Sequence, residues 1–185
     1  NFSNDVLTKK INTHGTFIAG IIAGLDNGFG ITGIAHGCSL LDVKVANNDG
    51  TTDALKVARG IIWAADNGAD VINISIVISG DYPLLEYAVD YAWNKGCVIV
   101  AAAGNNASSI PVFPAAYDNV IAVGASDLND AITRSSNHGD WVSVIAPGVN
   151  IYSTLPGDKY GYSNGTSLST ALVSGEAALL VTGAM

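Results

Sequence analysis

The sequence predicts an α/β fold, a three-layer α/β/α sandwich around a mostly parallel central sheet, and three observations indicate it. Short apolar runs rich in valine and isoleucine recur along the chain. Two amphipathic helical patterns lie between these runs, and a glycine follows each of them. Strands that alternate with helices form parallel sheets with helices on both faces. The 185 residues contain enough apolar material for one large core, so residues 1–185 are expected to form a single domain.

The expected strands are continuous apolar runs, a pattern typical of strands that are buried on both faces. They cover residues 39–46, 70–76, 97–103, 119–125 and 142–146. Residues 53–67 and 83–95 place apolar side chains at helical spacing. Asp53 is a candidate cap at the start of the first helix. Gly68 and Gly96 are expected to adopt the left-handed conformation that ends many helices.

Two further apolar segments are expected to be helical. Residues 17–24 (FIAGIIAG) combine isoleucine with small residues. A largely apolar helix is expected near the end of the sequence, and because it is apolar on most sides it should be central and buried. Its apolar and small residues include Ala171, Leu172, Gly175, Ala178 and Leu179. In parallel sheets ligands bind beyond the carboxyl ends of the strands, so residues that directly follow a strand are candidates for function.

The charge of the chain excludes two classes of partner. The formal net charge is −8, and the eight lysine and arginine residues form no basic run. A nucleic acid or an anionic membrane surface is therefore not an expected partner. No stretch approaches the roughly 18–20 apolar residues that cross a bilayer.

Cys38 and Cys97 lack the spacing of a metal or redox motif. Each lies beside an apolar, strand-like run, and we expect inert buried thiols. A disulfide between the two cysteines is the alternative.

Three short motifs contain residues that can carry out chemistry. His14 lies in THGTFIAG, Asn105 follows the apolar run that ends in AAAG, and Ser167 lies in NGTSLST at the start of the apolar helix. Taken singly, a histidine or serine at a helix start is most often a cap or a surface residue, and an asparagine after a strand is most often a turn former. Unpaired N–H groups in the first turn of a helix also favour negative charge that develops at a serine there.

Taken together, the three motifs in this order and spacing resemble the subtilisin-like serine proteases, the subtilase or S8 peptidase family. The segments 70–75 (DVINIS), 120–125 (VIAVGA) and 145–149 (IAPGV) are also similar to that family. The resemblance implies a serine endopeptidase that forms an acyl-enzyme. It implies His14 as the general base, Ser167 as the nucleophile and Asn105 as the side chain of the oxyanion hole.

The sequence departs from the family pattern in two places. The family aspartate lies on a strand well upstream of the histidine, whereas thirteen residues precede His14 here. We therefore expect a fragment that lacks the strand carrying this aspartate and also the C-terminal end, with Asp5 as a weak substitute. After the nucleophile the family has a Pro-His pair, where this chain has Ala171 and Leu172.

The resemblance also implies a substrate cleft between two chain segments. Ser75, Ile76 and Val77 would pair with the substrate backbone, and Gly50, Thr51 and Thr52 would lie opposite, so that an extended peptide adds as a strand. Ala102, Gly104 and Val112 complete the implied set. Valine at 77 and 112, where the family carries smaller residues, predicts a narrow primary specificity pocket.

The loop 25–31 (LDNGFGI) resembles a calcium loop of the same family. The implied ligands are the main-chain carbonyls of Leu25, Phe29 and Ile31 and the side chain of Asn27. A plain glycine-rich turn is the alternative. Residues 28–33 also fit the pattern GxGxxG of dinucleotide-binding domains, but here the pattern follows a helix and precedes a strand, which is the reverse of the required context.

One alternative on function remains open, and the resemblance also implies the partners and the location of the protein. A catalytically silent subtilisin-like module that acts by binding would explain the missing aspartate. The expected partners are a peptide or protein substrate and a propeptide or N-terminal segment. The resemblance implies a secreted or extracytoplasmic protein.

Overall fold

The computed structural model describes residues 1–2 and 12–183, and ten helices and strands lie within them. The helices are α1 (His14–Ala23), α2 (Ala54–Asp66), α3 (Pro83–Asn94) and α4 (Thr166–Thr182). The strands are β1 (Val71–Ile74), β2 (Val98–Ala102), β3 (Val120–Ser126), β4 (Val144–Pro147), β5 (Ile151–Leu155) and β6 (Lys159–Ser163).

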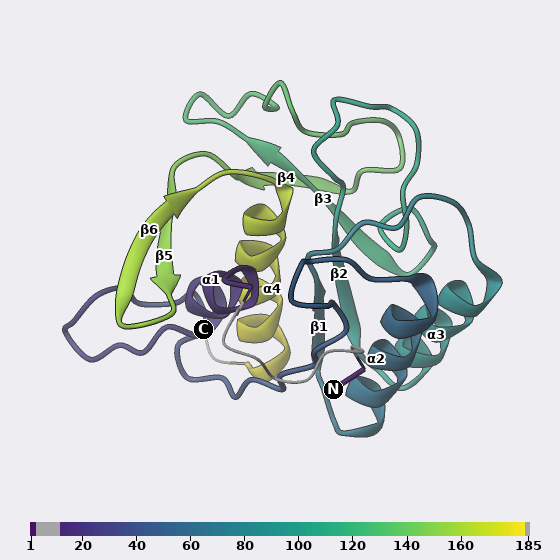
Figure 1. The fold of residues 1–185 in the computed structure, drawn as a ribbon, viewed down its shortest axis with the longest axis horizontal. Helices are drawn as coiled ribbons and strands as arrows, with labels where there is room; N and C mark the ends of the chain where they lie inside the picture. The colour runs from purple at the N-terminus through teal and green to yellow at the C-terminus, as the bar shows by residue number, and fades with distance from the viewer. Residues whose placement is uncertain (3–11, 184–185) are drawn as a thin grey trace.

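A parallel sheet forms the centre of the molecule. Its strands follow the order β1-β2-β3-β4, and each neighbouring pair is parallel. Helices α2 and α3 pack together on one face, while α4 crosses the other face and carries α1 on its outer side (Figure 1). The predicted three-layer α/β/α arrangement is therefore confirmed.

Two buried clusters fill the layers between sheet and helices. The larger lies between the sheet and the α2–α3 pair and contains Leu85, Val89 and Ile99, each at most 1% exposed. The smaller joins α1 to α4 through Phe17, Ile21 and Leu168. Because α4 contacts both the sheet and α1, the prediction of a central buried helix is also confirmed.

The predicted ends of the helices agree with the structure. The Asp53 carboxylate accepts a hydrogen bond from the Lys56 amide at 2.9 Å, as an amino-terminal cap does. Gly68 and Gly96 have φ angles of +78° and +90°, and this left-handed conformation is free of strain only in glycine.

The predicted strand at 39–46 is wrong. A strand requires a ladder of backbone hydrogen bonds with a neighbouring strand. Within the described residues, one backbone hydrogen bond reaches this segment, from the Phe2 amide to the Lys44 carbonyl, and this does not make a ladder. Its valines pack instead on helix α2, where a methyl group added to Gly60 would lie 2.5 Å from Cγ1 of Val45. Val43 and Val45 are thus partly buried against a helix, whereas Leu40 and Leu41 in the same run are exposed.

The antiparallel hairpin β5–β6 was not predicted. It stands beside α1 rather than in the main sheet (Figure 1). The Ser153 and Thr154 hydroxyls donate hydrogen bonds to the main-chain oxygens of Phe17 and Thr16, at 2.7 and 2.9 Å. Two adjacent residues of β5 thus present hydroxyls to α1, and the strand lacks the alternation of apolar and polar residues that normally identifies a strand.

Both cysteines are free, so the alternative of a disulfide is wrong. Cys97 is 3% exposed and its thiol contacts the Ala69 carbonyl at 3.0 Å, while Cys38 is only partly buried. Burial raises the pKa of both thiols, and this disfavours the reactive thiolate. None of the described helices is long and apolar enough to cross a membrane.

Candidate active site

The start of helix α4 brings Ser167 next to the segment that carries Asn105. Ser167 is the second residue of the helix and is partly buried, and Thr166 before it is fully buried. Oδ1 of Asn105 accepts a hydrogen bond from the Thr166 amide at 2.9 Å. Gly165 has φ +133°, and a Cβ there would lie 3.2 Å from Oδ1 of Asn105. The absence of a side chain at 165 is therefore what allows Asn105 to approach the helix.

This hydrogen bond determines what the Asn105 amide can do. Because Oδ1 is occupied by the helix, Nδ2 is the group left to donate to a ligand. Within the described residues no hydrogen bond uses Nδ2 of Asn105 or the hydroxyl of Ser167. At the start of α4 the Thr166 amide donates to Asn105 and the Leu168 amide donates to the Gly165 carbonyl, so the Ser167 amide is the N–H group left beside the Ser167 hydroxyl. Together with Nδ2 of Asn105 it suits an oxyanion.

Strand β1 and the residue that follows it are also hydrogen-bonded to helix α4. The Ser75 hydroxyl donates to the main-chain oxygen of Ser167 at 3.1 Å. Nδ2 of Asn73 donates to the Ser75 hydroxyl at 3.1 Å, and the Ser174 hydroxyl donates to Oδ1 of Asn73 at 2.9 Å. The predicted substrate-binding residue Ser75 therefore also fixes the backbone of the candidate nucleophile.

Asn137 is a residue of this site that sequence reasoning missed. Its side chain is 1% exposed and makes three hydrogen bonds to the segment that carries Asn105. Oδ1 accepts from the amides of Asn106 and Ser108 at 2.9 and 3.1 Å, and Nδ2 donates to the Ala103 carbonyl at 2.8 Å. In the sequence Asn137 lies in a polar stretch, and no pattern distinguishes it there from the neighbouring polar residues.

Gly104 shows how closely Asn137 supports this loop. Its φ is +98°, and a Cβ at this position would lie 2.7 Å from Nδ2 of Asn137. Its amide donates to the Thr166 hydroxyl at 3.1 Å. Gly104 therefore joins the loop to helix α4, and Ala102 before it is buried in strand β2.

His14 lies on the other side of Ser167. It is the first residue of α1, its side chain is exposed, and its amide donates to Oδ1 of Asn12 at 2.9 Å. His14 lines a pocket of about 240 Å³ together with Leu168, the residue after Ser167, and Tyr162. The predicted base therefore lies at a pocket that Leu168 lines and Ser167 does not, and no direct hydrogen bond joins the side chains of His14 and Ser167.

The protonation of His14 depends on the groups around it. Nearby protein atoms remove part of its hydration, and this desolvation lowers the pKa of the imidazole below its usual value of 6.5. A carboxylate beside the imidazole would act in the opposite direction. No hydrogen bond or ion pair joins His14 to a carboxylate within residues 1–2 and 12–183. Asp5, the weak substitute, lies outside the described residues.

A second cavity, of about 620 Å³, contains part of the predicted substrate cleft. Thr52 lines one side and Val77 the other, together with residues from the starts of α2 and α3. The lining consists of Thr52, Asp53, Ala54, Leu55, Val77, Ile78, Ser79, Tyr82 and Leu84. One residue of each predicted segment, Thr52 and Val77, therefore lines the same cavity.

The other predicted cleft residues are not among those that line this cavity. Gly50 and Thr51 form an exposed turn in which Gly50 has φ +87°. Ile76 is partly buried and packs against the larger core cluster. Val112 precedes Phe113, which exchanges two backbone hydrogen bonds of 2.8 and 3.0 Å with Ile78, and this antiparallel pairing directs Val112 toward Ser79 rather than Val77.

The candidate calcium loop follows helix α1, away from Ser167. Oδ1 of Asn27 accepts a hydrogen bond from the Phe29 amide at 3.1 Å. The carbonyls of Leu25, Phe29 and Ile31 accept no backbone hydrogen bond from the described residues. Because the loop follows α1 and does not open a helix, the dinucleotide-binding alternative is wrong.

Many known proteins are similar to this chain, and three of them show the extent of the similarity. The chain is 49% identical over 178 residues to the thermophilic serine proteinase of Bacillus sp. (strain AK1). The aligned region covers 96% of the chain and 44% of that proteinase. It is 46% identical over 178 residues to thermitase of Thermoactinomyces vulgaris, covering 96% of the chain and 64% of that protein. It is 42% identical over 173 residues to subtilisin BL of Lederbergia lenta, covering 94% of the chain and 64% of that protein.

These relatives extend well beyond the matched region, because the chain spans between 44% and 64% of their lengths. The family model described as the Subtilase family matches residues 3–184. The match covers the helix that begins with His14, the loop that carries Asn105 and the helix that carries Ser167. This chain therefore belongs to the Subtilase family.

Proposed function

We propose that this chain carries the catalytic groups of a serine endopeptidase. The observation that carries the proposal is the hydrogen bond from the Thr166 amide to Oδ1 of Asn105, since it brings an amide donor to the residue before Ser167. Ser167 attacks the carbonyl carbon of a peptide bond while His14 accepts the hydroxyl proton. Nδ2 of Asn105 and the backbone N–H of Ser167 stabilise the oxyanion.

The reaction then proceeds through an acyl-enzyme, which forms as the amine leaves and is hydrolysed afterwards. His14 gives its proton to the leaving amine, the new amino terminus departs, and a water molecule activated by the same imidazole hydrolyses the ester of Ser167. In the family the imidazole is supported by an aspartate, and we propose that the full-length protein supplies one to His14.

The test is hydrolysis of a peptide substrate by the full-length protein and by its Ser167→Ala variant. We expect the variant to lose turnover and to keep its unfolding temperature, because the Ser167 hydroxyl makes no hydrogen bond with the described residues. Activity that survives in Ser167→Ala would exclude Ser167 as the nucleophile.

A catalytically silent binding module is the second candidate. The observation in its favour is that no described carboxylate contacts His14. A silent module would bind peptide and fail to react with a phosphonate directed at active serines, whereas an endopeptidase would be labelled at Ser167.

The cavity beside Val77 supports a proposal on substrate choice. Val77 is 40% exposed and its side chain takes up space in the 620 Å³ cavity, whose lining does not include Val112. We propose that a peptide substrate lies between Thr52 and Val77 and that slender side chains are preferred before the scissile bond. A peptide library in which phenylalanine and tyrosine dominate that position would contradict the proposal.

Calcium binding is proposed for the loop 25–31. The carbonyls of Leu25, Phe29 and Ile31 are available and oxygen ligands suit calcium, whereas Oδ1 of Asn27 must share its lone pairs with the Phe29 amide. An ion that binds only the native state stabilises it, so excess chelator should lower the unfolding temperature. An unchanged transition in chelator would exclude the site.

We further propose peptides or proteins as substrates, a propeptide or N-terminal segment as an intramolecular partner, and secretion or extracytoplasmic location. Support for these points comes from family membership. Detection of the mature protein in the culture medium or only in the cell pellet tests the location.

A further inference from the structure

Three tyrosines and one phenylalanine form a continuous line of rings, the aromatic row (Tyr162, Tyr152, Tyr160 and Phe29). In the β5–β6 hairpin Tyr152 lies opposite Tyr162, and Thr154 lies opposite Tyr160. Side chains alternate between the two faces of a strand, so the three tyrosines share one face. Successive ring centroids, in the order given, are 4.7, 5.7 and 6.2 Å apart.

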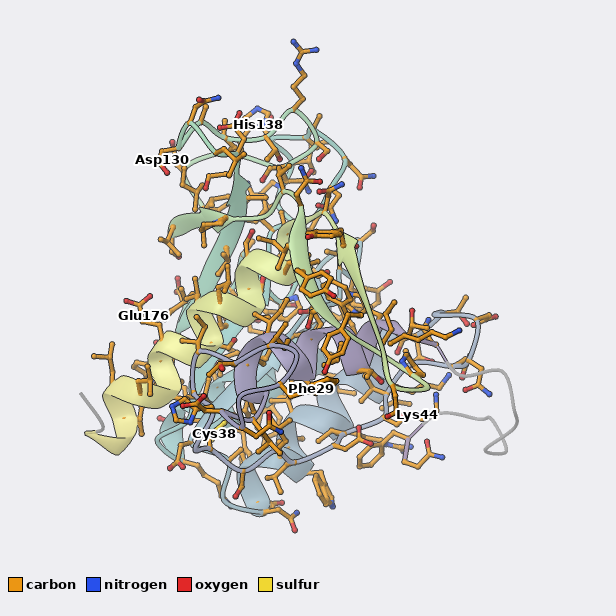
Figure 2. All side chains as sticks on the ribbon, turned by 90° about the vertical axis from the view of Figure 1, so that its left-hand side faces the viewer. Phe29, Cys38, Lys44, Asp130, His138 and Glu176 are labelled. Atoms are coloured by element: carbon orange, nitrogen blue, oxygen red, sulfur yellow. The ribbon has the colours of Figure 1, made fainter. Side chains whose placement is uncertain are left out.

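The aromatic row is exposed. Tyr162, Tyr152 and Phe29 keep 72%, 44% and 75% of their surface open to solvent. Figure 2 shows Phe29 in front of helix α1 and close to the hairpin. Gly30 allows the last contact, because at φ +70° it leaves room for the Tyr160 ring, which a Cβ would overlap. Contiguous exposed aromatic rings are the surfaces at which proteins bind partners.

One end of the aromatic row lies at the candidate active site. Tyr162 lines the 240 Å³ pocket with His14 and Leu168. The cavity lined by Thr52 and Val77, where the acyl part of a substrate is proposed to lie, is formed by the starts of α2 and α3. The hairpin and the α2–α3 pair lie on opposite sides of α4 (Figure 1). The aromatic row therefore leads away from Ser167 on the side that the leaving group occupies.

We infer that the aromatic row binds the part of a polypeptide substrate beyond the scissile bond and selects aromatic and large apolar side chains there. The inference rests on the proposed function. The three centroid steps together equal at most about five extended residues at roughly 3.3 Å each. Rings spaced in this way stack on aromatic and apolar side chains, and the exposed hydroxyls of tyrosine remain in water.

The experiment compares three substrates with the same acyl part in the full-length protein. One is an internally quenched peptide with phenylalanine and leucine at the third to fifth positions after the scissile bond, one has glycine and serine there, and one is an anilide. We expect kcat/KM for the aromatic peptide to exceed that for the glycine-serine peptide at least fivefold. Tyr152→Ala should bring this ratio close to one, since Tyr152 contacts both other tyrosines.

Tyr87→Ala is the matched control. Tyr87 is 59% exposed and contacts a second tyrosine, Tyr91, at 6.3 Å, but it lies on α3. The ratio should keep its wild-type value in this variant. Tyr152→Phe, which retains the ring and the fold, should also keep the ratio, so a loss in Tyr152→Ala is assigned to the ring.

The outcomes separate the two proposals. If none of the three substrates is cleaved, the proposed function fails. If the anilide is cleaved while the ratio is near one, or while Tyr152→Ala leaves it unchanged, the inference about the aromatic row is wrong. Self-association that Tyr152→Ala abolishes, with no change in the ratio, would assign the aromatic row to a second copy of the chain and would also overturn the inference.

Discussion

Asn137→Ala tests whether the loop of Asn105 owes its position to one buried side chain. The substitution removes three hydrogen bonds of 2.8–3.1 Å and leaves the amides of Asn106 and Ser108 and the Ala103 carbonyl without their partner. A buried polar group left unpaired costs about 1–3 kcal/mol, and water that enters the space recovers part of this. We expect the free energy of unfolding to fall by about 2–4 kcal/mol.

The stability of the variant is measured in a Ser167→Ala background, because this removes self-digestion. A loss of this size lowers the unfolding temperature by about 5–15 °C in a protein of this length. Ser136→Ala is the control. Ser136 is 2% exposed and its hydroxyl accepts from the Ala125 amide at 3.0 Å, so its loss also leaves a buried amide unpaired. The Ser136 hydroxyl donates to the main-chain carbonyl of Asn137 at 2.9 Å, but it makes no hydrogen bond to the Asn137 side chain or to the 103–108 loop.

Kinetics distinguish positioning from stability alone. Loss of an oxyanion-hole amide lowers kcat by about 10²–10³ in a subtilisin, a measured value that we carry over from that enzyme. Misplacement of the Asn105 amide should cause part of that loss in kcat. We therefore expect Asn137→Ala to lower kcat by about tenfold with little change in KM. In an Asn105→Ala background the same change should have almost no further effect on kcat.

Ser136→Ala should destabilise the protein and leave kcat within about twofold of wild type at a temperature where both variants are folded. Equal effects of Asn137→Ala on kcat in the presence and absence of the Asn105 side chain would refute the positioning role. A stability loss below about 1 kcal/mol would refute the estimate from unpaired groups.

Two further predictions concern capping and titration. Asp53→Ala should destabilise α2 by about 1 kcal/mol in urea unfolding. The hydrogen bond from the Lys56 amide lowers the pKa of Asp53 in the folded protein. The stabilisation that the Asp53 carboxylate contributes is therefore present above the unfolded pKa near 3.8 and is lost as the pH falls through the lower folded pKa. A difference in unfolding free energy between Asp53→Ala and wild type that stays constant from pH 7 to pH 2 would contradict this. Burial raises the pKa of Tyr117 to about 12, so ultraviolet titration should show one tyrosine that ionises late and stability that declines as the pH rises from about 10 to 12. Tyr117→Phe should abolish the late step and cost about 1–3 kcal/mol, because the Tyr82 amide loses its acceptor at 3.0 Å; full stability of the variant would contradict this.

The central sheet and its helices could be predicted because each element is encoded locally. Valine and isoleucine runs identify β1, β2, β3 and β4, and the spacing of apolar residues identifies α2 and α3. The segment 39–46 shows the limit of this argument, because an apolar run does not identify the neighbour of each side chain. Its valines pack on α2 and are partly buried, while Leu40 and Leu41 are exposed, and no pattern within the segment reveals this difference.

The candidate site divides in the same way. His14, Asn105 and Ser167 could be found because each lies in a recognisable motif at the end of an element. Asn137 could not, since its role depends on contacts with residues about thirty positions earlier in the chain. The aromatic row likewise depends on the strand register, which brings Tyr152 opposite Tyr162 and next to Tyr160.

The central claim, that Ser167 is an activated nucleophile, is tested most directly by labelling the full-length protein with a peptidyl phosphonate and mapping the modified residue by mass spectrometry. Ser169 is the internal control, because it is fully buried two residues away and its hydroxyl contacts the Ala146 carbonyl at 2.9 Å. We expect a single label on Ser167, its loss in Ser167→Ala and its retention in Ser169→Ala. A folded protein that stays unlabelled, or that carries the label on a residue other than Ser167, would contradict the account.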